Sequence, residues 1–297
     1  MNPSSRRAVL AADLSLFLVA VVWGAGFPFC AHLLEVLSPL WMVALRLSLS
    51  ALFLLVLFRR RVREADREAW RGSLALGALM TGVFVLLALG LAASSPGKQA
   101  FISGTYVVQV PFLLWLLYRR RPSLFAFGGA LVVSLGLGIM AFTPGMRFVA
   151  GDLYNAVLAL GCACQVLAIG WLARRIDPLT LTTLHLAFAA LFLTVLALLL
   201  EPLPSLALGA VAWGELLFVS LGGTVVAFLV QCTAQRFTPE SHAAVIMSLE
   251  SPFGYLIAVW LGLDPWSPRA VLGGLLILGG VLLTEWETFL RREAEAA

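Results

Sequence analysis

Five polar side chains that can bind a charged or polar solute occur inside otherwise apolar stretches of this sequence. They are Arg46, Gln109, Gln165, His185 and Glu250. An arginine presents its N–H donors as a planar fork, which fits a carboxylate through two parallel hydrogen bonds. A lone carboxylate such as Glu250 can carry a proton, receive an amino group or pair with Arg46. These residue types favour recognition of a small zwitterionic solute.

The same sequence gives little support for catalysis or metal binding. The three histidines, His32, His185 and His242, are scattered, and no HExxH, CxxC or carboxylate cluster is present. A stretch from Gly90 to Gly97 resembles a phosphate-binding loop, but six residues separate its glycines where that loop has four. We therefore expect that the protein is not an enzyme and has no metal site and no cofactor. Any transport by this chain would take its energy from a gradient or from exchange.

The elements that position these side chains are expected to be membrane-spanning helices. Hydrophobic residues make up 61% of the 297 residues and charged residues only 12%, whereas a soluble domain has about 25% charged residues. Since about 20 apolar residues cross a bilayer as a helix, the chain divides into ten spans. The predicted spans are 12–33, 39–58, 72–91, 100–118, 124–142, 153–173, 178–200, 210–234, 242–261 and 270–290.

Basic residues predict the orientation of these spans. With a cytoplasmic N-terminus, the inside segments hold the arginine clusters at 59–61 and 119–121, and the outside segments hold only Lys98, Arg147 and Arg269. This bias places both termini in the cytoplasm. The net charge of +4 thus belongs to short loops, and we expect no nucleic-acid partner. The single lysine and the lack of a glycosylation sequon favour a bacterial plasma membrane.

An internal repeat organises the spans. "SPLWMVALRLSLSALFLLVL" (38–57) aligns with "DPLTLTTLHLAFAALFLTVL" (177–196), and "SPGKQA", "QVPF" and "GGALVVSLG" meet "TPESHA", "ESPF" and "GGLLILGG" in the same order. The order and near-constant spacing indicate a duplication. The predicted repeats are 1–147 and 148–297, each with five helices.

Because five is an odd number, the second repeat must enter the membrane upside down. The loop at 59–71 carries six arginines, whereas its counterpart "EPLPSLALG" carries none. Matched loops of opposite charge bias are typical of an inverted-topology repeat. The fold class is therefore all-α integral membrane, with ten transmembrane helices as two inverted five-helix repeats around a central cavity. Arg46 pairs with His185 under this repeat, and Gln109 pairs with Glu250.

Several motifs resemble those of a known family. "WGAGF" in the first span, "LRLSLSALF" in the second, the prolines of the fourth and ninth, and "GGLLILGGVLL" near the end resemble EamA-type members of the drug/metabolite transporter superfamily. Among these, YddG-type amino-acid exporters are the most similar. The resemblance implies a cavity between spans 1–4 and 6–9, with spans 5 and 10 set to the side, and export or exchange of metabolites. "LGLDPWSP" departs from the Gly-Glu that many members carry before the last span.

The candidate substrate-binding residues follow from depth and residue type, since a polar group inside a span normally faces a cavity or a partner. They are Arg46, Gln109, Glu250, His185, Trp23 and Gln165. Alternatives remain open for several of them. Arg46 could form an internal ion pair or cap carbonyl groups, His185 and Gln165 could only tie helices together, and Trp23 could be a core aromatic.

Pro111 and Pro252 lie inside the fourth and ninth spans, where each removes one backbone hydrogen bond. We expect kinked helices there and a hinge role, with static packing as the alternative.

A secondary transporter that exports or exchanges small metabolites by alternating access fits these features best, with amino acids as the favoured substrate class. The alternatives are a sugar-phosphate or nucleotide-sugar exchanger and a cationic-drug exporter, and a membrane-embedded enzyme is more distant. The expected partners are the substrate and the lipid bilayer, and the expected assembly is a monomer or a homodimer.

Overall fold

The structure is a computed structural model that describes residues 3–94, 96–119, 123–141, 149–262 and 265–294. Within these ranges all regular elements are helices. The first half contains α1 (Pro3–Val36), α2 (Pro39–Leu57), α3 (Arg59–Arg63), α4 (Arg67–Ala93), α5 (Pro96–Gly104), α6 (Tyr106–Tyr118) and α7 (Leu124–Ala141). The second half contains α8 (Ala150–Ala173), α9 (Pro178–Leu200), α10 (Ala210–Leu217), the π-helix η1 (Phe218–Val226), α11 (Ala227–Ala234), α12 (Glu240–Met247), α13 (Glu250–Trp260) and α14 (Pro268–Ala294).

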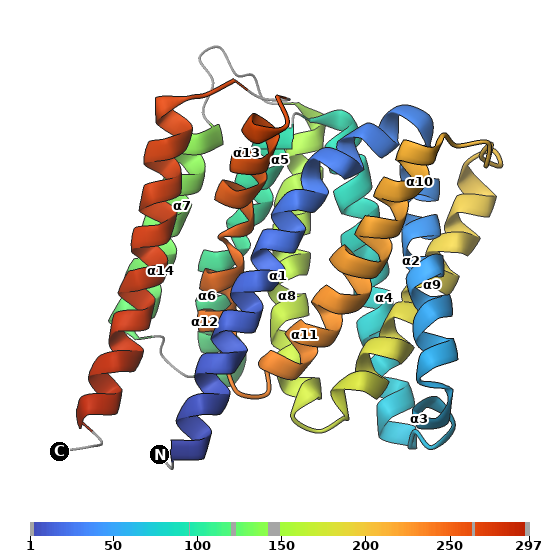
Figure 1. Ribbon diagram of the computed structural model, residues 1–297. Helices are drawn as coiled ribbons and strands as arrows, with labels where there is room; N and C mark the ends of the chain where they lie inside the picture. The colour runs from blue at the N-terminus through green and yellow to red at the C-terminus, as the bar shows by residue number, and fades with distance from the viewer. Residues whose placement is uncertain (1–2, 95, 120–122, 142–148, 263–264, 295–297) are drawn as a thin grey trace.

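The predicted ten spans are present in this set. Among the described residues, eight helical segments are long and apolar enough to cross a membrane, and two shorter apolar segments, Phe101–Leu117 and Pro268–Thr284, fill the remaining positions. In Figure 1, α1 begins and α14 ends at the same end of the bundle. We call this the basic end, because Arg59–Arg63, Arg174, Arg175 and Arg236 lie there.

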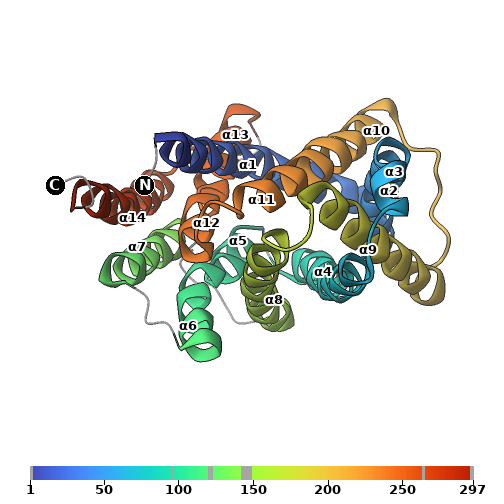
Figure 2. The same ribbon diagram turned by 90° about the horizontal axis from the view of Figure 1, so that it is seen from below.

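Helices α7 and α14 form a pair at one side of the bundle (Figure 2). Their backbones meet at glycines: a Cβ added to Gly136 would lie 2.5 Å from the Gly273 carbonyl oxygen, and one added to Gly280 would lie 2.6 Å from that of Gly129. Small residues allow such close approach between membrane helices. The expectation that spans 5 and 10 stand to the side is confirmed.

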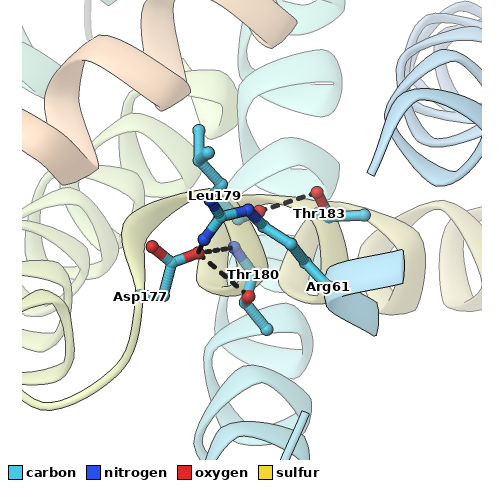
Figure 3. A network of polar contacts seen from close by, with 5 residues as sticks. All are labelled: Arg61, Asp177, Leu179, Thr180 and Thr183. Atoms are coloured by element: carbon cyan, nitrogen blue, oxygen red, sulfur yellow. Dashed lines mark hydrogen bonds and ion pairs between the residues drawn. The ribbon is translucent and has the colours of Figure 1, made fainter. Parts of the chain in front are cut away.

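Helices α2 and α9 occupy equivalent positions in the two repeats and run antiparallel to each other, as inverted repeats require. At the basic end, the Asp177 carboxylate accepts hydrogen bonds from the Thr180 N–H (3.1 Å) and hydroxyl (3.0 Å) at the start of α9, and Arg61 Nη1 lies 3.1 Å from it (Figure 3). At the other end, the Glu201 carboxylate accepts from the Leu40 and Trp41 N–H groups at the start of α2. At each end, a charged residue beyond the C-terminus of one helix thus contacts the start of its counterpart: Arg61 the N-cap residue of α9, and Glu201 the first turn of α2.

The fourth and ninth spans are each divided into two helices. One interruption is at Thr105, between α5 and α6, and the other is at Ser248 and Leu249, between α12 and α13. Both use i→i−3 hydrogen bonds, from Thr105 N to Ile102 O and from Leu249 N to Ile246 O, each 3.2 Å long. Pro111 and Pro252 follow within two turns, inside α6 and α13, so each span that was expected to be kinked has an interrupted turn before its proline. The hinge role of Pro111 and Pro252 stays a prediction.

Two hydrophobic clusters fill the bundle. One is built mainly from α2, α4, α9 and η1, and the other from α1, α6, α7, α8, α12 and α14. The side chains of Trp23 and Cys162 pack against both clusters. The central cavity lies at this boundary.

Candidate binding cavity

A central cavity of about 1040 Å³, including the space at its mouth, lies between the two halves of the molecule. Its walls come mainly from α1, α4, α5, α8, η1 and α13, with single side chains from α2 (Arg46), α6, α11 and α12. Most of the lining is apolar, and the polar side chains in it are few. They are Trp23, Arg46, Gln99, Ser103, Tyr106, Gln165 and Glu250. An apolar cleft with a few placed polar groups is the usual form of a small-molecule site.

The cavity extends from the middle of the bundle toward the end opposite the basic end. On α4 the lining runs from Met80 to Leu91, in the half of the helix farther from the basic end. On α8 it stops at Val166, although the helix continues to Ala173 at the basic end. At the basic end itself, packed side chains such as Gln235 and Thr238 are fully buried.

Arg46 is held in the cavity wall by neutral groups. Its Nε donates to Thr224 Oγ1 at 2.8 Å, Nη2 donates to the Gly223 carbonyl oxygen at 3.2 Å, and Nη1 lies 3.7 Å from Cys30 Sγ. The guanidinium carbon lies 5.2 Å from the centre of the Phe84 ring, a cation–π distance. In the part of the chain that the structure describes, no carboxylate lies within 4.0 Å of the guanidinium. The charge of Arg46 therefore has no counter-ion there.

The acceptors for Arg46 come from the π-helical segment η1. The Thr224 hydroxyl also donates to the carbonyl oxygen of Val219, five residues earlier, at 2.9 Å. Ser50, one turn after Arg46 on α2, donates to Ser220 O at 2.9 Å. The wider π turn thus presents carbonyl and hydroxyl oxygens sideways to α2. Such segments are frequent at functional sites.

Glu250 supplies a carboxyl group to the cavity wall, and it is the first residue of α13 directly after the interrupted turn. A Cβ added to Gly24 would lie 2.6 Å from the carbonyl oxygen of Glu250, so the glycine lets α1 approach α13 closely at this point. Among the described residues, the Glu250 carboxylate forms no hydrogen bond or ion pair. A guanidinium and a carboxyl group, neither of them in an ion pair within the described part of the chain, therefore line one cavity.

The structure brings four of the six predicted substrate-binding residues into the cavity wall, namely Trp23, Arg46, Gln165 and Glu250. Gln109 lies outside the lining, with Nε2 3.4 Å from Thr105 Oγ1 on its own span. His185 also lies outside it, where Nδ1 bonds the Leu181 carbonyl oxygen at 2.7 Å. The reason is geometric. Inverted repeats place equivalent residues in opposite halves of the bundle, and the cavity occupies mainly one half.

Sequence reasoning missed Gly223 and Thr224 as parts of the site. The pattern "LGGTV" carried only a weak signal, because a glycine pair lowers helix propensity but also occurs in the fifth and tenth spans, where it serves close packing. Under the repeat, Thr224 in the eighth span matches Thr81 in the third. In the structure Thr81 donates within α4, to Gly77 O at 2.8 Å. Equivalent threonines therefore have different roles.

Comparison with known proteins gives one family. The model of the EamA-like transporter family matches residues 10–142 and again residues 149–286. A protein named "Uncharacterized transporter" from Archaeoglobus fulgidus is 27% identical over 92% of this chain and 85% of its own length. Another uncharacterized transporter, from Synechocystis sp., is 22% identical over 76% and 74%. A solved structure titled only as a crystal structure of a protein matches with a TM-score of 0.79 at 17% identity, over 96% of this chain and 99% of that one.

Proposed function

Since the chain belongs to the EamA-like transporter family, we propose that it is a secondary transporter for small zwitterionic metabolites, with amino acids as the substrate class. It exports or exchanges them by alternating access. The proposed membrane is the plasma membrane, with both termini in the cytoplasm.

The observation that carries this proposal is Arg46. A charged side chain at the centre of a bilayer costs at least about 2.5–3.5 kcal/mol and normally faces a partner or a water-filled cavity. The three hydrogen-bond contacts of Arg46 are all with neutral groups, and three of the five N–H donors of its guanidinium are used in them. The remaining donors are available to a solute in the cavity. A carboxylate fits them in both charge and geometry.

Glu250 supports a zwitterion over a simple anion. A substrate carboxylate at Arg46 and a substrate ammonium group at Glu250 would neutralise both side chains of the cavity wall. Aromatic and apolar side chains such as Phe27, Met80 and Phe84 line the same cavity and suit the carbon skeleton of such a solute. Phosphate dianions are less suited, because they are usually met by several cations.

A cationic-drug exporter is the second candidate, and it rests on Glu250 together with the aromatic lining. The rings of Trp23, Phe84 and Phe228 face the same cavity, and aromatic faces attract organic cations. This reading gives Arg46 no partner. The two candidates therefore differ in whether Arg46 is needed for transport.

Alternating access is supported by three features of the fold. The two repeats are inverted, and a pair of inverted repeats can exchange conformations to open either end in turn. The cavity extends toward one end only. The interrupted turns at Thr105 and Leu249 lie in equivalent spans and provide places where α5 and α12 can move relative to α6 and α13.

Counterflow in proteoliposomes tests the proposal directly. Vesicles loaded with one unlabelled compound are offered trace amounts of its labelled form, using amino acids, sugar phosphates and lipophilic cations in turn. We expect accumulation of one or more amino acids. Exchange of phosphates or cations alone would contradict the assignment, and protein-free vesicles give the background.

A further inference from the structure

Buried glutamines lie between the inner limit of the cavity and the basic end. Gln165 on α8 lines the cavity, and Gln231 and Gln235 lie one helical turn apart at the end of α11. Residues four apart on a helix share one face. Gln231 and Gln235 are both 0% exposed. Together they extend a row of amide groups from the cavity toward the basic end.

The amides in this row are only partly hydrogen-bonded. Gln165 Nε2 donates to Gln231 Oε1 at 3.1 Å, and Gln235 Nε2 donates to the Val166 carbonyl oxygen at 3.0 Å. Within the described residues, Gln231 Nε2 and Gln235 Oε1 have no hydrogen-bond partner. A buried polar atom without a partner destabilises a fold by about 1–3 kcal/mol. Among the described residues, the row therefore keeps one free donor and one free acceptor in this conformation.

The duplicated fold does not require amides at these positions. Trp70 in the third span matches Trp213 in the eighth, and the same offset places Ala88 at the sequence position of Gln231 and Ala92 at that of Gln235. The first repeat thus builds the equivalent helix with small apolar residues. The glutamines are specific to the half of the bundle that is closed in this structure.

Beyond the glutamines, contacts between different helices hold the basic end closed. The Thr238 hydroxyl lies 2.7 Å from Asp13 Oδ1, and His242 Nε2 lies 3.7 Å from Asp13 Oδ2. Arg174 Nη1 lies 2.8 Å from Glu240 Oε1. These contacts join α1 and α8 to α12 and to the segment before it, so separating them opens the bundle next to Gln235.

We propose that Gln165, Gln231 and Gln235 form the second half of the translocation path. Water and the solute contact these side chains when the basic end opens. The inference rests on the proposed transport function. The proposal explains why two amide atoms have no hydrogen-bond partner among the described residues of the closed form, because water or solute supplies the partners in the open form. It also specifies the substrate. A path of neutral donors and acceptors can pass a solute without net charge, since weak binding at several sites allows both entry and exit.

Thiol labelling tests the opening of this path. In the variant Gln235→Cys, a membrane-impermeant maleimide is added to vesicles of each orientation, and mass spectrometry locates the label. We expect the introduced thiol to be labelled by reagent added at the basic end. The labelling rate should be at least threefold higher during substrate exchange than without substrate. Cys232, three residues earlier and fully buried in the core, is the internal control and should stay unlabelled. Absence of label at the introduced thiol from the basic end would overturn the path.

Replacement by leucine tests the need for amides. In Gln231→Leu and Gln235→Leu we expect exchange to slow at least tenfold, while substrate binding to the cavity changes less than twofold and the melting temperature does not fall. Thr233→Val, on the exposed side of the same helix, is the matched control and should transport normally. Normal exchange in both leucine variants would overturn the path.

The outcomes separate the two levels of inference. If the unmodified protein exchanges none of the tested solutes, the proposed function fails, whatever the labelling shows. If it exchanges amino acids but the thiol at position 235 is never labelled, only the path fails.

Discussion

Trp23 and Arg46 donate hydrogen bonds to the same oxygen atom, the carbonyl oxygen of Gly223. Trp23 Nε1 lies 2.8 Å from it, and Arg46 Nη2 lies 3.2 Å from it. One carbonyl of the π-helical segment therefore orients two side chains of the cavity wall that belong to different helices. This relationship makes Trp23 a positioning residue for the guanidinium as well as a wall of the cavity.

Replacing Arg46 by lysine keeps the charge and loses the planar fork. We expect the affinity for carboxylate substrates to fall about tenfold to a hundredfold, which corresponds to about 1.5–3 kcal/mol for hydrogen bonds to a charged group. Binding titration and counterflow measure the effect, with expression and melting temperature as controls. Normal transport would make Arg46 a structural residue, and so would a variant that only unfolds.

Replacing Trp23 by phenylalanine removes the N–H donor and keeps an aromatic ring near Phe228, whose ring centre lies 5.7 Å away. Gly223 O then keeps Arg46 as its partner, so we expect a loss of stability of only about 0.5–1.5 kcal/mol. Affinity for the carboxylate should fall a few-fold, because the guanidinium is less well fixed. An unchanged affinity would show that Arg46 needs no help from Trp23.

Glu250→Gln keeps the shape of the side chain and removes its charge. We expect weaker binding of amino acids and little change for analogues that lack the amino group. Arg46→Lys should show the opposite pattern, with losses for all carboxylates and little change for amines. Competition assays with paired analogues measure both variants side by side. Equal losses for both analogue types in Glu250→Gln would contradict its role as the ammonium site.

Pro111→Ala and Pro252→Ala restore one backbone donor each near the interrupted turns. If these turns move during transport, exchange should slow several-fold while stability stays the same or rises. Pro39→Ala is a suitable control, because Pro39 stands in the first turn of α2, where its missing N–H has no cost. Unchanged exchange in both test variants would leave the prolines with a packing role.

Reporter fusions after residues 65 and 204 test the orientation. Residue 65 lies in the arginine-rich connection at the basic end, and residue 204 lies in the connection before α10 at the other end. We expect a cytoplasmic signal at 65 and an external signal at 204, as the positive-inside rule requires. The reverse result would place the mouth of the cavity on the cytoplasmic side.

The spans, the inverted repeat and the place of Arg46 at a cavity could be predicted from the sequence, because length, loop charge and a deep arginine are strong signals. The faces of the helices could not. A membrane helix is apolar toward lipid and toward its neighbours, so hydrophobic periodicity does not identify the side that faces a cavity. For this reason Gln109 and His185 were predicted as binding residues beside Glu250 and Arg46, although the structure places them outside the cavity wall.

The hydrogen-bond partners of Arg46 could not be predicted from the sequence for a different reason. A π-helical segment depends on local backbone hydrogen bonds, and apolar composition carries no information about whether a turn closes at four residues or at five. The glycine pair at Gly223 indicated only that helix propensity is low in the middle of the eighth span. The geometry that makes Thr224 an acceptor for Arg46 became visible only in the fold.

The π-helical segment also sets the rotational phase of the eighth span. In an α-helix each residue turns the chain by about 100°, and a wider turn rotates everything after it relative to a continuous helix. The segment Phe218–Val226 separates α10 from α11, whereas α4 runs without such a change from Arg67 to Ala93. Aligned residues of the two repeats therefore drift out of angular register halfway along the span. Two copies of one ancestral apolar pattern can in this way direct different faces toward the axis of the bundle.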